Sequence, residues 1–326
     1  TDKVNENGIL EWKVPGSSKD KWYVFSFYGG PTGMTPMSDA KSNPNLASLV
    51  VDILNSNSVD ILLEDLLGTK NKLFGDLKPF YGSTFRALFT DSQEIADEWF
   101  WTDKFFKKFK ELRGYDVKPY LPACFVPNRD NQFLEVFFQN TKPCFEFPAD
   151  DVGERIRYDW LTTLSDMWSK EFIKHVSEKA KEWGIEHRIQ TYGMPVDVLK
   201  TFGASDIPET ETLFSGSLDF FKTASSAAIL YGKNQVSSET FSWMNQDLTL
   251  TPLKWKAIID KLTVAGINQN VYHGWTYTPV HAKQNINEDN MSKNNTDVDK
   301  KLPKKEIWGQ EKYPGHYPWA GHGFSN

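Results

Sequence analysis

The chain has 326 residues, a length that suits one large domain or two domains of ordinary size. Hydrophobic residues make up 39% of the chain, so it can bury a sizeable core and global disorder is excluded. The net charge is −6 and the 37 basic residues are scattered, which argues against a nucleic-acid partner. No stretch approaches the roughly 18 apolar residues of a membrane span, so none is expected.

Aromatic residues are abundant, at 14% of the chain. An ordinary core explains most of them, and a minority of the tryptophans suits stacking against sugar rings. The two cysteines, Cys124 and Cys144, have no zinc-site spacing. They form either one disulfide or two free thiols.

The first part of the chain predicts β structure and then a helix. Residues 8–28 alternate between apolar and polar side chains, which indicates two short β segments joined by a Gly/Ser turn. Residues 46–67 have apolar side chains at helical spacing. Residues 283–306, near the other end, are polar and charged and predict a surface loop or a disordered insertion.

From residue 84 onwards, predicted strands alternate with amphipathic helices. The strands are expected at 84–90, 185–193, 209–214, 233–243 and 267–275, and the helices at 95–114, 151–184, 218–232 and 251–266. This alternation indicates an α/β fold with a parallel sheet. Because the strands are fewer than the eight of a closed barrel, we expect a (β/α)8-type barrel that is incomplete on its N-terminal side.

Acidic, aromatic and histidine side chains follow the predicted strands. The active site of parallel βα folds lies at the carboxyl ends of the strands, so these side chains should gather there. In chain order they are Asp91, Glu94, Tyr192, Glu209, Glu211, Glu239, His273, Trp275 and Tyr277. Two carboxylates that face one cleft suit glycoside hydrolysis, in which one donates a proton and the other activates water or attacks the sugar.

Several of these residues also have an ordinary structural explanation. Asp91 can cap a following helix, with Glu94 as its capping-box partner. Glu239 can be an exposed strand residue, and His273 a core or surface histidine.

Glu209 and Glu211 alternate along one extended segment, so their side chains point the same way. A pair of this kind is either a solvated edge or a cation site. Oxygen-only ligands favour Ca²⁺ over a transition metal.

Eight motifs occur in a characteristic order along roughly residues 8–280. They are WYVFSFYGGPTG, TDSQE, RGYDVKPYLP, RYDWLTTLSDMWSKEF, QTYGMP, SDIPETETLF, SSETFSW and INQNVYHGWTYTP. Each motif is weak alone, but the ordered set resembles glycoside hydrolase family 106, whose characterised members are α-L-rhamnosidases. The resemblance implies an inverting, calcium-dependent enzyme built on a (β/α)8 barrel with appended β domains.

The resemblance also implies roles for individual residues. Glu94 matches the general acid of the family, and Asp91 matches the aspartate of the same motif. Glu239 matches the general base. Glu209 and Glu211 lie in a segment that we associate with sugar or calcium contacts.

Further residues are expected to contact the sugar, and one position departs from the family. The expected substrate-binding residues are Asp91, Tyr192, Glu211, Trp243, His273 and Trp275. A glutamate usually precedes the Tyr-Gly pair of the family, whereas this chain has Gln190 in that neighbourhood. That difference puts one metal or substrate contact in question.

The prediction is therefore a secreted or periplasmic inverting hydrolase that uses Ca²⁺ and cleaves terminal α-L-rhamnosyl linkages in plant-type polysaccharides or glycosides. The alternatives are a retaining glycosidase with Glu239 as nucleophile and a non-catalytic carbohydrate-binding relative. Residues 1–30 are assigned to an appended β domain, and residues 31–326 to the barrel, with its polar insertion at 283–306. No signal peptide opens the chain, and it is expected to be a fragment of a longer protein.

Overall fold

The computed structural model describes residues 4–13, 16, 21–30, 50–68, 76–93, 100–125, 143, 145–149, 151–212, 217–242 and 251–273. The chain divides into two compact units, Thr1–Thr32 and Gly33–Asn326. Among the described residues, no helix combines the length and the apolar character that a membrane span needs.

The smaller unit contains one short β contact. Val4 and Leu10 form an antiparallel bridge, and the side chain of Asn5 accepts hydrogen bonds from two backbone N–H groups inside the turn. Residues 22–28, expected to be the second β segment, form no ladder with any described residue. Their side chains are exposed, with Tyr28 94% exposed. The alternating pattern is therefore present, but no partner strand for it lies among the residues that the structure describes.

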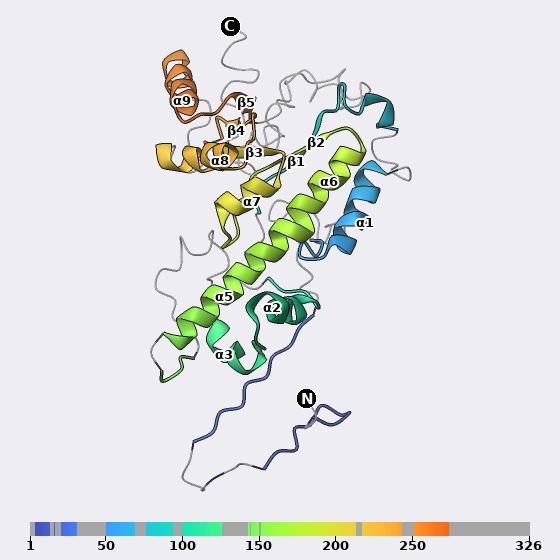
Figure 1. The fold of residues 1–326 in the computed structure, drawn as a ribbon, viewed down its shortest axis with the longest axis vertical. Helices are drawn as coiled ribbons and strands as arrows, with labels where there is room; N and C mark the ends of the chain where they lie inside the picture. The colour runs from blue at the N-terminus through green and yellow to red at the C-terminus, as the bar shows by residue number, and fades with distance from the viewer. Residues whose placement is uncertain are drawn as a thin grey trace, which may run out of the picture. The chain divides into compact units, whose positions relative to one another are not determined.

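The larger unit is built around a five-stranded parallel sheet in which each strand pairs with the next in chain order. Figure 1 labels the five strands. The strands are β1 Ala87–Thr90, β2 Glu186–Ile189, β3 Ile207–Glu211, β4 Ser237–Thr240 and β5 Gln269–Tyr272. All four pairings are parallel. The predicted α/β class is confirmed. Four of the strands lie within their predicted ranges, and β3 begins two residues earlier than predicted, at Ile207.

Helices connect the strands. They are α1 Ser56–Leu67, α2 Phe105–Arg113, α3 Leu121–Cys124, α5 Val152–Met167, α6 His175–Glu182, α7 Val198–Ala204, α8 Leu218–Leu230 and α9 Pro252–Val264. Short 3-10 turns lie at Lys78–Phe80 and Lys118–Tyr120. A π-helical segment, Trp168–Lys174, joins α5 to α6, so the helix predicted over 151–184 is one continuous rod in Figure 1.

Two helices begin later than predicted. The helix expected from residue 46 begins at Ser56, because the side chain of Asn55 accepts the N–H of Asn57 at 3.3 Å and caps it there. The helix expected from residue 95 is described only from Phe105. Just before it, the Thr102 hydroxyl donates to Asp52 at 2.6 Å, which fixes this segment in a non-helical path.

Two short helices, α3 and α7, were not predicted; α3 has only four residues, and α7 is the longer of the two. It spans only seven residues, too few to show a helical period in the sequence. The Asp197 side chain accepts the N–H of Lys200 at 3.0 Å and caps its first turn.

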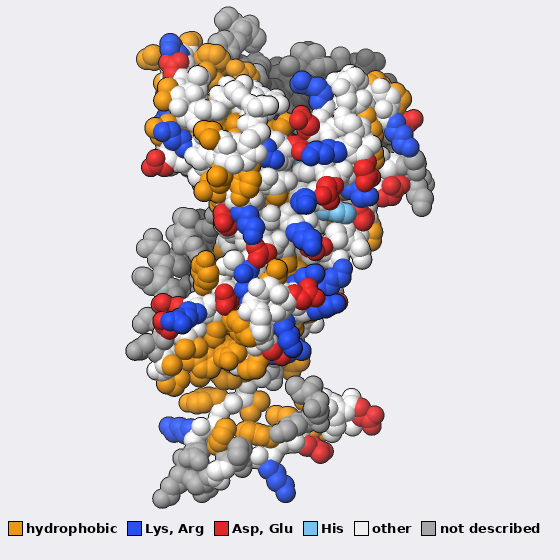
Figure 2. Space-filling model, viewed as in Figure 1, with side chains coloured by type: hydrophobic (Ala, Val, Ile, Leu, Met, Phe, Trp, Pro, Cys, Tyr) orange, Lys and Arg blue, Asp and Glu red, His pale blue; other side chains and the backbone are white. Residues whose placement is uncertain are grey.

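Apolar clusters pack the helices around the sheet. The largest joins α1, α2, α5 and the π-helical segment through buried side chains such as Phe105, Phe109 and Trp168. A second lies under α7, α8 and α9 and contains Phe202 and Phe221. Helix α8 packs against β3 and α6 packs against β2. On the face shown in Figure 2, acidic and basic side chains of the larger unit are interspersed.

Candidate active site

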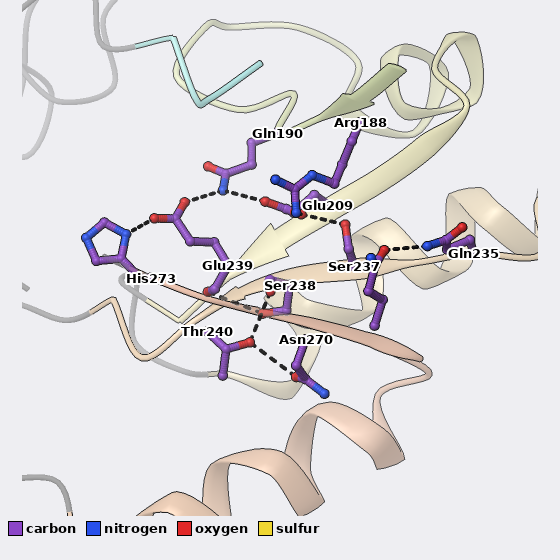
Figure 3. Close-up of polar contacts among 11 residues, drawn as sticks. Arg188, Gln190, Glu209, Gln235, Ser237, Ser238, Glu239, Thr240, Asn270 and His273 are labelled. Carbon is purple, nitrogen blue, oxygen red and sulfur yellow. Dashed lines mark hydrogen bonds and ion pairs between the residues drawn. The ribbon is translucent and has the colours of Figure 1, made fainter. Parts of the chain in front are cut away.

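Glu239 lies near the carboxyl end of β4 and is only 8% exposed, so the alternative of an exposed strand glutamate is wrong. Two side chains hold its carboxylate, one on each oxygen (Figure 3). Gln190 Nε2 donates to Oε2 at 2.6 Å, and His273 Nδ1 contacts Oε1. These partners follow β2 and β5, so three strand ends converge on one carboxylate.

The surroundings of Glu239 hold its pKa below the ordinary value for a glutamate. Burial alone raises this pKa, because desolvation penalises the charged form. The hydrogen bond and charge of His273 oppose that effect, as do the amide of Gln190 and the charge of Arg188, and together they outweigh it. The carboxylate is therefore ionised at neutral pH, and it is suited to accept a proton or to attack a carbon rather than to donate a proton.

Glu209 lies beside this pair on β3 and is fully buried. Its Oε2 atom lies 3.0 Å from Arg188 Nη1 and accepts the hydroxyl of Ser237 at 2.5 Å, while its Oε1 atom accepts from Gln190 Nε2 at 3.3 Å. Burial raises the pKa of Glu209 to about 7, against the opposing charge of Arg188 and the hydrogen bonds. Both oxygens already have partners inside the protein, and the role of Glu209 as a calcium ligand stays a prediction.

Glu211 follows Glu209 by two residues, at the end of β3, and is also buried. Its register partner on β4 is Glu239. No three Asp, Glu, His or Cys side chains of the described ranges are grouped so that they could hold a metal ion. The expectation of Ca²⁺ at Glu209 and Glu211 stays a prediction from the family resemblance.

The loops that follow β1 and β2 are joined by their backbones. The N–H of Gln93 donates to the carbonyl of Tyr192 at 3.0 Å. Gly193 has φ +96°, and a Cβ atom there would lie 2.5 Å from the carbonyl oxygen of Gln93. Only glycine fits this position. Asp91 lies at the start of the first loop, where its side chain accepts the N–H of Ser92 at 2.8 Å.

Two other predicted sugar contacts are described. His273 follows β5, its N–H donates to the carbonyl of Thr240 at 2.8 Å, and its side chain is 23% exposed. Tyr192 is buried, with its ring 5.1 Å from that of Phe220. Burial raises the pKa of Tyr192 well above 10, and nearby carboxylates add to this shift: Glu211, Glu239, Glu209 and Asp91.

Some predicted residues lie outside the described ranges. They are Glu94, which follows Gln93 in the sequence, Trp243, Trp275, Tyr277 and Cys144. The polar insertion at 283–306 also lies outside them. Cys124 is described and is buried at the end of α3.

Arg188 and Ser237 belong to this site but were not predicted, and Gln190 was noticed only as a departure from the family. A signal for them exists in the sequence. Polar residues recur at a period of two along consecutive strands: Arg188 and Gln190, then Glu209 and Glu211, then Ser237 and Glu239. Side chains at this spacing share one face of a sheet, and in a buried strand they must satisfy one another.

Comparison with known proteins adds three findings. The model of glycoside hydrolase family 106, described as alpha-L-rhamnosidase, matches residues 1–137 and 147–310. A curated protein of Formosa agariphila, strain DSM 15362, titled putative beta-glucuronidase, is 27% identical over 282 residues, which cover 86% of this chain and 22% of that protein. A solved structure of a rhamnosidase from Novosphingobium sp. PP1Y matches with a TM-score of 0.60 and 24% identity, over 84% of this chain and 25% of the other.

The structural match supports the fold, an α/β arrangement in which the parallel strands form a half-barrel. The chain spans about a quarter or less of the length of both relatives.

Proposed function

We propose, because this chain belongs to glycoside hydrolase family 106, the alpha-L-rhamnosidase family, that it carries part of the active site of an inverting α-L-rhamnosidase. The observation that supports this function most directly is the state of Glu239, a buried strand-end carboxylate that its neighbours keep ionised. We place the protein outside the cytoplasm, secreted or periplasmic, where it acts on plant-type polysaccharides or glycosides.

The proposed reaction uses two carboxyl groups in different protonation states. Glu239 removes a proton from water as the water oxygen bonds to the anomeric carbon. Glu94 gives its proton to the glycosidic oxygen as the carbon–oxygen bond breaks. The lowered pKa of Glu239 suits the base, and the acid is assigned to Glu94 by the family motif alone.

Three further assignments complete the proposal. The five strands belong to a (β/α)8 barrel. The walls of the sugar site include Asp91, Tyr192, Glu211, Trp243, His273 and Trp275. Ca²⁺ is retained as a prediction, and none of the steps above depends on it.

The direct test measures hydrolysis of 4-nitrophenyl α-L-rhamnopyranoside by the full-length protein, beside 4-nitrophenyl β-D-glucuronide. We expect turnover of the rhamnoside, with Glu239→Gln lowering kcat by about 10²- to 10⁴-fold, the usual range for a lost general base. Glu186→Gln is the matched control, since Glu186 lies exposed at the start of β2. Turnover of the glucuronide alone would overturn the proposed sugar.

The stereochemistry is tested separately. An NMR time course of the first-formed sugar should show inverted configuration at the anomeric carbon. Retained configuration would make Glu239 a nucleophile, because an ionised carboxylate suits that role equally well. Binding of rhamnose without turnover would identify a non-catalytic carbohydrate-binding protein.

A further inference from the structure

The carboxylate of Glu239 is held more firmly than its burial requires. A buried carboxylate needs hydrogen bonds, but one partner on one oxygen still leaves the group free to tilt. Here Gln190, from the end of β2, and His273, from the end of β5, bind different oxygens of the carboxylate (Figure 3). Their directions fix the plane of the carboxylate as well as its position.

The amide of Gln190 is itself fixed in one orientation. Its nitrogen donates to Glu239 at 2.6 Å and to Glu209 at 3.3 Å, and the residue is fully buried. Only the N–H₂ side of an amide can donate to two carboxylates, so a flipped amide would place its oxygen against both of them. Gln190 therefore transmits the position of Glu209 to Glu239.

Glu209 is anchored in turn. Arg188 and Ser237 both bind its Oε2 atom, at 3.0 Å and 2.5 Å. The guanidinium of Arg188 also lies 4.3 Å from the ring centre of Phe89 on β1. The contacts run from β1 through β2 and β3 to the carboxylate on β4, so the sheet itself sets the position of that carboxylate.

We infer that Gln190 and His273 are positioning residues for Glu239, and that Glu209 is the anchor of Gln190 rather than a metal ligand or a proton donor. This inference rests on the proposed function, in which Glu239 accepts the proton of the attacking water. The advantage is geometric, because a misplacement of about 1 Å in a catalytic group can lower the rate about 100-fold.

The test compares steady-state kinetics of variants of the full-length protein on the aryl rhamnoside. Gln190→Met and His273→Leu each remove one hydrogen bond to Glu239. We expect each to lower kcat about 10- to 100-fold, since the lost contact orients the base. Gln190→Met should leave KM nearly unchanged, because Gln190 is fully buried. His273→Asn, whose amide N–H takes the place of Nδ1–H, should recover most of the loss.

Gln235→Met is the matched control. Gln235 precedes β4, and its amide donates to Gln269 on β5, remote from Glu239 in Figure 3. The same substitution there should leave kcat unchanged. The folding of each variant is checked by circular dichroism and thermal unfolding. If Gln190→Met does not fold, the comparison of His273→Leu with His273→Asn tests the inference by itself. His273 is partly exposed, so these substitutions disturb the core less.

The outcomes separate the two proposals. If Glu239→Gln abolishes turnover while Gln190→Met and His273→Leu keep the wild-type kcat, the positioning inference is wrong and the proposed function stands. If Glu239→Gln itself keeps wild-type activity, the proposed base is wrong. A rise in KM without a fall in kcat in either variant would show that the lost hydrogen bond does not orient the base, and it would also overturn the inference.

Discussion

Gly193 joins the two loops in which candidate residues follow β1 and β2. Its φ of +96° favours glycine, and its Cα lies so close to Gln93 that a Cβ atom would come within 2.5 Å of that carbonyl. Gln93 is in turn the residue before Glu94 in the sequence. A change at Gly193 should therefore disturb the path of the chain that leads to the proposed acid.

We expect Gly193→Ala to lower both stability and kcat. Forcing alanine into a left-handed conformation costs about 1–2 kcal/mol, and the overlap with Gln93 adds a displacement of its backbone. Gly232→Ala is the matched control, because Gly232 also has positive φ but no atom lies within 4 Å of its added Cβ. Thermal unfolding and kcat are measured for both. An equal loss of stability with unchanged kcat in the two variants would contradict the role given to the close contact.

At this scale the sequence alone predicts which acidic residues lie near the strand ends, but it does not predict how they pair. Glu209 and Glu239 look alike in the sequence, since each lies in a polar strand and is followed by a threonine. Their different environments arise from Arg188 and His273, which are distant in the chain. Because desolvation and charge compete within each pocket, the pKa of Glu209 rises and that of Glu239 falls.

At the level of elements, the residues that end helices were predicted well. The predicted ranges 95–114, 151–184 and 218–232 each end on a glycine, and in the structure Gly114, Gly184 and Gly232 follow their helices with positive φ. Pro252 opens α9. Helix beginnings were predicted less well. Hydrogen bonds of the Asn55 and Thr102 side chains set where α1 and α2 begin, although apolar residues continue the helical spacing before them. The spacing of apolar residues in the sequence does not reveal these hydrogen bonds.

His187 on β2 makes the stability of the folded chain depend on pH. The side chain is fully buried, with Nε2 3.0 Å from the hydroxyl of Thr90 on β1. Burial lowers the pKa of His187 to about 4, despite the opposing backbone carbonyl of Ile173 and the charge of Asp206. The unfolded chain therefore binds a proton at a pH where the folded chain does not.

Because the folded-state pKa is depressed, the stability that His187 contributes is complete above its ordinary pKa of about 6.5 and is lost as the pH falls through about 4. The loss is on the order of 3 kcal/mol. We expect His187→Gln to remove this part of the acid sensitivity. The free energy of unfolding of the wild type and of His187→Gln is measured by urea unfolding from pH 4 to pH 8. The contributions of other titrating groups are the same in both proteins, so they drop out of the difference. A pH-independent difference would contradict the prediction.

Across the whole molecule, the family resemblance predicts that EDTA lowers activity and that Ca²⁺ restores it. The structure adds a restriction, because the oxygens of Glu209 are occupied by Arg188, Ser237 and Gln190. Glu209→Gln should therefore leave the Ca²⁺ concentration for half-maximal recovery unchanged, whatever its effect on kcat. Activity of the full-length protein is titrated with Ca²⁺, with Mg²⁺ as the control cation. A shift of about tenfold or more in that concentration would make Glu209 a ligand after all.

The five-stranded sheet is buried most completely at its centre. Every residue of β3 and β4 is buried, whereas β1 and β5 are partly exposed. Each of these outer strands pairs with one neighbour among the described residues. A closed barrel has no edge, since every strand then has two neighbours and all its backbone N–H groups are bonded.

If the half-barrel is part of a closed (β/α)8 barrel, the outer strands must gain a second neighbour in the full-length protein. Hydrogen exchange followed by mass spectrometry should then find the amides of β1 and β5 as protected as those of β3 and β4, because all four strands would open only when the barrel unfolds. An open sheet predicts the opposite, since outer strands lose their hydrogen bonds by local fraying. Much faster exchange in β1 and β5 than in β3 and β4 would exclude closure, and it would leave the strand ends that hold Glu239 as a site on an open sheet.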